Sequence, residues 1–119
     1  MESQPQAVPT SNKIYLQRAL AAVEEFRKLH SDLPMTVASL FTYVAANPGV
    51  SMDELRKQTN TTQATCSRTI AVLSEWQEYD KPGFGLVWTE EDPKERRKKL
   101  VHLTEMGEEL AVTLDDILH

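Results

Sequence analysis

Residues 51–73 read SMDELRKQTNTTQATCSRTIAVL, and this stretch predicts two helices joined by a tight polar turn. Ser51 and Glu54 have the spacing of a capping box, in which the serine oxygen and the glutamate carboxylate satisfy free amides at the start of a helix. We expect this helix to end near Gln58 and residues 59–61 to form the turn. Two helices joined by so short a turn are the layout of a helix-turn-helix.

The second helix of this pair is expected to run from Thr62 to about Gln77. Its inward stripe, at helical spacing, consists of Cys66, Ile70 and Leu73, with Trp76 at the margin. At about 100° per residue, Arg68 points away from this stripe. The side chains available to donate hydrogen bonds to phosphates or base edges are Thr61, Thr62, Gln63, Thr65, Ser67 and Arg68. The plainer alternative is a solvated arginine beside threonines that cap the helix.

A charged hairpin is predicted after this helix. Two short β-prone runs, 86–89 and 100–103, bracket a loop over residues 90–99, and Pro93 fits a loop better than the centre of a paired strand. The loop carries five positive charges, on Lys94, Arg96, Arg97, Lys98 and Lys99. Such a tip either enters a DNA minor groove or is a solvated loop, and on an acidic chain so dense a cluster favours DNA contact.

Further helices are expected on both sides of this unit. Residues 12–30 predict an amphipathic helix, and Pro34 starts a second helix that residues 47–49 (Asn-Pro-Gly) stop. Thr104 caps a last helix, whose apolar face is Leu110, Leu114, Ile117 and Leu118. The predicted fold is therefore mainly α with a small β-hairpin (α+β), a winged helix-turn-helix with flanking N- and C-terminal helices.

Composition limits the domain count and the class of protein. The chain of 119 residues fits one domain over residues 12–119, after an arm over residues 1–11 that has no periodic apolar positions and is expected to be flexible. The net charge is -5, but residues 105–119 hold five carboxylates and no Lys or Arg, so charge is segregated. A single cysteine, Cys66, excludes an intrachain disulfide, and no Cys/His spacing indicates a metal. Without a signal peptide or membrane span, the expected compartment is the cytoplasm.

Catalysis and cofactors are not expected. The sequence has no nucleophile elbow, no phosphate loop and no paired histidine and carboxylate arrangement. Cys66, on an inward stripe, is expected to be a small apolar filler and not a redox sensor. Four aromatic residues near the hairpin either line a pocket for a small-molecule effector or close the core: Trp76, Tyr79, Phe84 and Trp88.

Three segments resemble the multiple antibiotic resistance regulator (MarR) family. Residues 95–97 and 103–107 (L-T-E-M-G) are similar to the family's D-x-R wing and its L-T-x-x-G continuation, with Glu where Asp is usual. Residues 67–73 are similar to its recognition-helix pattern, and residues 51–55 to its opening S-x-x-E-L helix. The resemblance covers about residues 33–110.

This resemblance implies a transcription regulator, repressing by occupancy, that binds double-stranded DNA as a homodimer. It places the second helix of the helix-turn-helix in the major groove and the hairpin in the adjacent minor groove. The terminal helices, 12–31 and 104–118, are the implied dimerisation elements. We expect the contacts across the two-fold axis to be Leu20, Val23, Leu110, Leu114 and Ile117. Compared with the family, about eight residues are inserted between Leu73 and Gly85.

Two other functions remain open from the sequence. One is a protein-interaction adaptor with a winged-helix fold, for which the acidic C-terminal helix is a surface that binds another protein. The other is architectural DNA binding without sequence preference, which predicts a steep salt dependence. Substitution of Arg68 and Arg97 separates the adaptor from the regulator, because only DNA recognition needs both residues.

Overall fold

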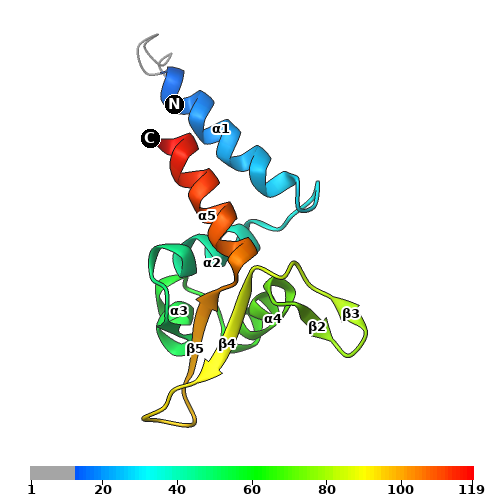
Figure 1. Cartoon of the computed structure of the whole chain (residues 1–119), viewed down its shortest axis with the longest axis vertical. Helices are drawn as coiled ribbons and strands as arrows, with labels where there is room; N and C mark the ends of the chain where they lie inside the picture. Colours follow the sequence, from blue (N-terminus) through cyan, green and yellow to red (C-terminus); the bar gives the residue numbers. More distant parts are fainter. Residues whose placement is uncertain (1–12) are drawn as a thin grey trace, which may run out of the picture.

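The computed structural model describes residues 13–119, so the arm expected over residues 1–11 lies outside the described residues. The helices of this part are α1 Lys13–Arg27, α2 Met35–Ala46, α3 Met52–Gln58, α4 Gln63–Leu73 and α5 Glu105–Leu118. The strands are β1 Val50–Ser51, β2 Trp76–Glu78, β3 Lys81–Pro82, β4 Val87–Glu91 and β5 Lys99–Leu103. The winged helix-turn-helix with flanking helices is confirmed, and Figure 1 shows α1 and α5 side by side, extending away from the body that holds the other elements.

The core forms where α2 packs against the helix-turn-helix and the sheet. Leu40, Phe41 and Val44 of α2 are completely buried, as the spacing of apolar residues in this helix predicted. Pro34 was expected to be the first residue of this helix. It is instead the N-cap, and α2 begins one residue later, at Met35. The buried residues are Val37, Leu40, Phe41, Val44, Leu55, Cys66, Ile70, Leu73, Leu86, Val87, Val101 and Leu114. They come from α2, α3, α4, α5 and both wing strands, so the helix-turn-helix and the wing share one core.

The hairpin of β4 and β5, which we call the wing, belongs to a three-stranded sheet in the order β1-β5-β4. Trp88 faces His102 and Glu91 faces Lys99 across the antiparallel pair. The edge strand β1, in which Val50 pairs with Val101, was not expected. Two residues are too few to show the alternation by which a strand is recognised in a sequence. This strand joins the start of α3 directly to the wing.

The capping box at the start of α3 is only half formed. The Ser51 hydroxyl oxygen accepts a hydrogen bond from the Glu54 amide at 3.1 Å, as expected. The Glu54 carboxylate accepts instead from the side-chain amide of Gln58, at 3.2 Å. Ser51 thus caps the helix while it also pairs with Leu100 in the sheet.

We expect Ser51→Ala to lower the free energy of unfolding by about 1 kcal/mol, because the Glu54 amide then loses its acceptor. Chemical denaturation followed by circular dichroism measures this loss. Ser39→Ala, at an exposed position within α2, is the control and should be neutral or slightly stabilising. Equal unfolding free energies for Ser51→Ala and the wild type would contradict a capping role.

The expectation that α4 continues to about Gln77 was wrong, because the helix ends at Leu73. Its last carbonyls accept hydrogen bonds from the returning chain, Phe84 to Val72 at 2.9 Å and Leu86 to Leu73 at 2.8 Å. Between these points the chain forms the short β2–β3 hairpin, which accounts for the inserted residues and projects from the body in Figure 1. A Cβ on Gly83 would lie 2.0 Å from the Ser74 carbonyl oxygen, so only glycine fits this close return.

The start of α5 is attached to the wing through Thr104. Its hydroxyl donates to the Gly85 carbonyl at 2.6 Å and accepts from the Gly107 amide at 3.1 Å. The Thr104 amide donates to the Leu86 carbonyl at 3.0 Å. The L-T-x-x-G segment therefore fixes the direction in which α5 leaves the body.

Candidate nucleic-acid interface

The exposed side of α4 carries the polar residues predicted for it. Gln63, Ser67 and Arg68 are exposed, whereas Cys66, Ile70 and Leu73 are buried, as predicted. The expected donors Thr61 and Thr65 are half-buried and Thr62 is exposed. Arg68 thus presents its guanidinium on the surface of the second helix, as its position in the sequence indicated, and it forms no ion pair among residues 13–119.

Part of the threonine cluster is engaged within the chain. The Thr62 hydroxyl caps α4 by accepting from the Thr65 amide at 3.1 Å, and it donates to the Thr65 hydroxyl at 3.0 Å. Thr61 exchanges a hydroxyl hydrogen bond with Thr59 at 3.2 Å. The threonines therefore cap the start of α4, which was the plainer alternative given for them. Gln63, Ser67 and Arg68 remain as the exposed polar residues of the helix.

The wing loop is a compact turn, closed by hydrogen bonds. The Asp92 amide donates to the Lys98 carbonyl at 2.7 Å, and the Asp92 carboxylate accepts from the Lys94 amide at 2.8 Å. All five loop cations are exposed: Lys94, Arg96, Arg97, Lys98 and Lys99. Within residues 13–119, none of these five forms an ion pair with a carboxylate, so their charges are available to an anionic ligand.

A polar groove of about 710 Å³ lies between α3, α4 and the wing, and we call it the wing groove. Its lining residues are Met52, Asp53, Arg56, Gln63, Cys66, Ser67, Glu95, Arg97, Lys98 and Lys99. The structure thus brings Gln63 and Ser67 of the predicted set together with Arg97, Lys98 and Lys99. Thr61, Thr62, Thr65, Arg68, Lys94 and Arg96 lie outside this lining.

Arg56, which the sequence analysis missed, is a member of the wing groove. Its Nη2 donates to Asp53 Oδ1 at 2.8 Å, and Lys57 Nζ lies 3.0 Å from Asp53 Oδ2. Hydrogen bonds from Arg56 and then from Lys57 hold the pKa of the Asp53 carboxyl below its usual range. The spacing of Asp53 and Arg56, three residues apart, was a signal in the sequence, but it is also typical of ordinary surface ion pairs.

Cys66 lines the wing groove, and its surroundings make its thiol unreactive. Its side chain is buried, and burial raises the pKa of its thiol. A thiol with a raised pKa stays protonated at neutral pH, and thiols react as thiolates. The buried position agrees with the expected role of a small apolar filler.

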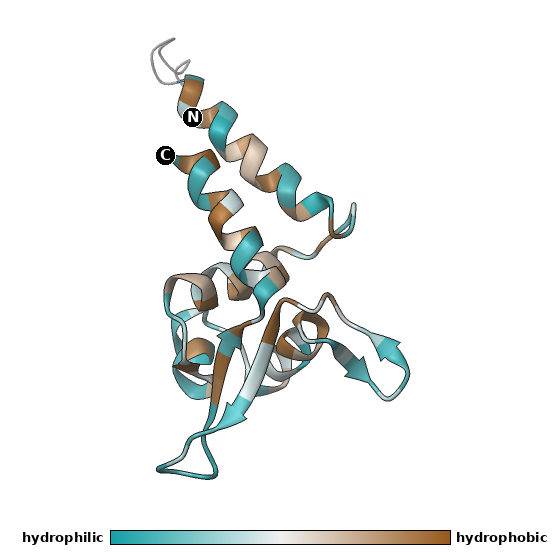
Figure 2. Cartoon of the chain, viewed as in Figure 1, coloured by the Kyte–Doolittle hydropathy of each residue, from teal (hydrophilic) through white to brown (hydrophobic). Residues whose placement is uncertain are grey.

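The two terminal helices present apolar side chains to the outside. Leu20 is 60% exposed and Val23 is 43% exposed, and α1 has no buried residue. In α5, Leu110 and Ile117 are half-buried and Leu114 is buried by the chain itself. Further exposed apolar residues on these helices are Ile14, Tyr15, Leu16, Met106, Val112 and Leu118. Figure 2 shows hydrophobic segments recurring along α1 and α5, whereas the wing tip is hydrophilic.

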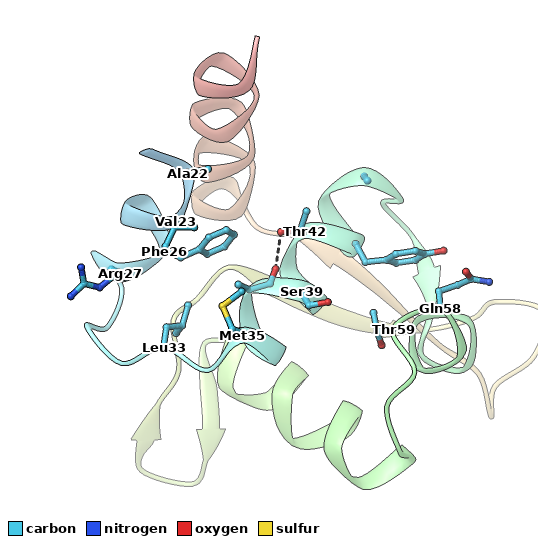
Figure 3. Close-up of a pocket in the computed structure, with 13 residues that line it drawn as sticks. Ala22, Val23, Phe26, Arg27, Leu33, Met35, Ser39, Thr42, Gln58 and Thr59 are labelled. Atoms are coloured by element: carbon cyan, nitrogen blue, oxygen red, sulfur yellow. Dashed lines mark hydrogen bonds between the residues drawn. The ribbon is translucent and has the colours of Figure 1, made fainter. Parts of the chain in front are cut away.

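An apolar pocket of about 620 Å³ lies between α1, α2 and the end of α3. Figure 3 shows Phe26, Leu33 and Met35 at one end and Gln58 and Thr59 at the other. The aromatic residues expected to line a pocket do not line this one. Trp76, Tyr79 and Trp88 are also too exposed to close the core, and only Phe84 packs against it. Trp76 and Tyr79 belong to the β2–β3 hairpin, which the prediction of a longer α4 did not include, whereas Trp88 lies in the wing strand β4, where a strand was expected.

Over residues 13–119, no helix combines the length and apolarity needed to cross a bilayer. The same residues contain no group of three His, Cys, Asp or Glu side chains placed to hold a metal ion.

The described elements define the class of protein. A helix-turn-helix that shares its core with a β-wing and is flanked by terminal helices is a winged-helix protein. The fold is that of the MarR transcriptional regulators, as solved structures of that family show.

Comparison with solved structures supports this assignment of the fold. MarR matches with a TM-score of 0.62 and 23% identity, over 92% of this chain and 75% of that chain. The MepR–DNA complex from S. aureus matches with a TM-score of 0.62 and 21% identity, over 90% and 77%. The PcaV regulator from Streptomyces coelicolor with its natural ligand matches with a TM-score of 0.59 and 17% identity, over 96% and 78%. No protein-family model matches the sequence, and no curated protein matches it significantly.

Proposed function

We propose that this protein is a cytoplasmic transcription regulator that binds double-stranded DNA sequence-specifically as a homodimer and represses by occupancy. One observation carries the proposal: Gln63 and Ser67 of α4 line the same groove as three wing cations, Arg97, Lys98 and Lys99, which form no ion pair among the described residues. An arginine on such a helix reads guanine edges in the major groove, while wing cations contact phosphates or the narrow minor groove. The S. aureus MepR structure, a complex with DNA, has the same fold.

The net charge of -5 does not contradict this proposal, because the charge is distributed unevenly. The carboxylates of residues 105–119 lie on or after α5, which extends away from the wing in Figure 1. The cations are concentrated at the wing loop. Residues 90–99 also hold four carboxylates, on Glu90, Glu91, Asp92 and Glu95, so the cations of this loop exceed its carboxylates by one. Most of α5, with its five carboxylates, extends away from the wing (Figure 1) and does not face a phosphate backbone bound there.

The experiment that tests the proposal is selection from a pool of random DNA duplexes with the purified protein. Enrichment of an inverted repeat with half-sites about one helical turn apart is expected, because a two-fold dimer presents two copies of α4. Absence of any enrichment at low salt would overturn the proposal. Binding without enrichment, with a steep salt dependence, would indicate the architectural alternative.

Substitution of the two arginines is expected to have different effects on the selected site. Arg68→Ala should weaken binding by about 1–3 kcal/mol and relax the preference at one base pair in each half-site. Arg97→Ala should weaken binding to all sequences similarly. Fluorescence anisotropy with the selected duplex and single-base variants measures both effects. Lys81→Ala, at an exposed position of the β2–β3 hairpin, is the charge-matched control, and equal losses for Lys81→Ala and Arg68→Ala would contradict base reading by α4.

The adaptor alternative depends on the acidic surface of α5. The exposed carboxylates there are Glu105, Glu108, Glu109, Asp115 and Asp116. The adaptor alternative would be favoured if the DNA selection fails and a basic protein partner binds to these carboxylates. A role other than catalysis agrees with the solved neighbours, which are transcription regulators.

A small-molecule effector is the second part of the proposal. The pocket between α1 and α2 is mainly apolar, and it joins a terminal helix to the helix-turn-helix through Gln58 and Thr59. A ligand in this pocket contacts α1, which is proposed for dimerisation, and also the end of α3, the first helix of the helix-turn-helix. PcaV, which has the same fold, has been solved with its natural ligand.

A further inference from the structure

We infer that Arg56 of α3, together with the cations of the wing, forms a phosphate-binding site in the wing groove, so that one backbone phosphate links the helix-turn-helix to the wing. The inference rests on the proposed function and deepens it by adding a residue of the first helix to the interface. The juxtaposition on which it depends is the shared lining of the groove by Arg56, Arg97, Lys98 and Lys99.

The charge balance of the wing groove favours an anion. The groove is lined by four cations and by two carboxylates, Asp53 and Glu95. Asp53 is shared between Arg56 and Lys57, so this three-residue cluster keeps a net positive charge. Glu95 forms no ion pair among the described residues, as noted for the loop cations. Within the lining, Arg56 and Asp53 of α3 balance each other, and the wing contributes three cations against the single carboxylate of Glu95, so the positive excess of the groove comes from the wing.

The Asp53 contact fixes Arg56 without using all of its donors. A guanidinium has five N–H donors in a rigid planar group, and one of them bonds to Asp53 at 2.8 Å. The Arg56 side chain is 34% exposed, compared with 58% for Lys57, so Arg56 is the more enclosed of the two. Lys57 does not line the groove. A fixed, partly enclosed arginine loses little freedom on binding a phosphate, which is the geometry that favours a strong contact.

Neighbouring groups of the groove are compatible with a phosphate. Ser67 and Gln63 of α4 line it with side chains that donate hydrogen bonds to phosphate oxygens. Both residues belong to α4, so a duplex that holds α4 in its major groove brings its backbone close to the wing groove. One phosphate is then contacted from α3 and from the wing.

The test compares Arg56→Gln with Lys57→Gln in binding to a random-sequence 24-base-pair duplex pool. Nonspecific binding is chosen because it depends on phosphate contacts and needs no knowledge of the operator. For Arg56→Gln we expect about a tenfold loss of affinity at low salt and a slope of log K against log salt that is smaller by about one. Lys57→Gln removes the same charge from the next residue of the same helix, and we expect a change of less than about twofold. Arg56→Lys should restore the slope.

Thermal unfolding of each variant separates lost contact from lost structure, and an Arg56→Gln protein with native unfolding and an unchanged slope would overturn the inference. Equal losses for Arg56→Gln and Lys57→Gln would also overturn it, because they would show only a general effect of charge. If Arg56→Gln is less stable than the wild type, Arg56→Met, which keeps the apolar stem, gives the same comparison. A wild-type protein that binds no duplex at low salt would defeat the proposed function as well, whereas binding that is insensitive to Arg56 would defeat only this inference.

Discussion

The Leu20→Glu variant is expected to be a monomer at micromolar concentration and to bind the inverted repeat at least about a hundredfold more weakly than the wild type. Leu20 is 60% exposed on α1, beside Val23 and Leu16, which are also exposed. Burying a leucine in an interface contributes about 1.5–3 kcal/mol, whereas burying an unpaired carboxylate costs several kcal/mol. A two-fold axis places each substitution in the interface twice, so the penalty counts for both protomers.

Analytical ultracentrifugation measures the dimer, and fluorescence anisotropy with a full inverted repeat and a single half-site measures the DNA affinity. Tyr79→Glu is the matched control, because it also replaces an exposed large apolar residue with a carboxylate, but on the β2–β3 hairpin. The control should remain dimeric. The half-site affinity of Leu20→Glu should be close to that of the wild type, since α4 and the wing are unchanged. A wild-type protein that is monomeric at micromolar concentration would contradict the dimer itself.

The single chain already covers some of the residues predicted as dimer contacts. Leu114 is buried in the single chain, and Leu110 packs against the same core. These two therefore contribute first to the attachment of α5, and the exposed residues of α1 and α5 remain for a partner. The predicted set of dimer contacts divides into residues that face inward and residues, such as Leu20 and Val23, that face outward.

The number and order of the helices were predictable, because each helix depends on residues close together in the sequence. The stripe of Cys66, Ile70 and Leu73 placed α4, and the Asn-Pro-Gly segment at 47–49 ended α2. The wing was predictable because two β-prone runs flank a loop too polar to be buried. Exposure of Arg68 followed directly from helical geometry.

The features that could not be predicted all depend on contacts between distant segments. At the end of α4, the carbonyls of Val72 and Leu73 accept hydrogen bonds from the amides of Phe84 and Leu86, and no residue near Leu73 indicates this return in the sequence. The strand β1 exists only because Val101 of the wing lies beside Val50. Arg56 joined the candidate site for the same reason, because the groove that it lines is made by three separate elements.

Gly107→Ala is expected to lower the free energy of unfolding by about 3 kcal/mol, through overpacking against the backbone. A Cβ at this position would lie 2.0 Å from the Leu86 carbonyl oxygen and 3.3 Å from the Leu103 Cβ. The carbonyl cannot move freely, since it accepts the Thr104 amide at 3.0 Å. The substitution therefore pushes the first turn of α5 away from the wing.

The sign of this effect distinguishes packing from helix propensity. Alanine is the better helix former by about 0.5–1 kcal/mol, so propensity alone predicts that Gly107→Ala stabilises the protein. Thermal unfolding at one fixed protein concentration decides between the two, and we expect the midpoint to fall by on the order of 10 °C. The control is Gly49→Ala, where φ is +84° but the nearest side-chain atom, on His102, lies 3.6 Å from the added Cβ. That variant should lose only about 1–2 kcal/mol, from backbone strain.

A stable Gly107→Ala protein would show that α5 can leave the body in another direction. The proposed function would also be affected, because in the proposed dimer α5 and α1 set the separation of the two copies of α4. If instead the variant is destabilised as expected while its remaining folded fraction still dimerises, the glycine acts in joining α5 to the wing and not in the dimer contact itself. The L-T-x-x-G segment then has a physical reason in this chain: Thr104 bonds to the backbone before the wing, and Gly107 allows the approach that makes those bonds possible.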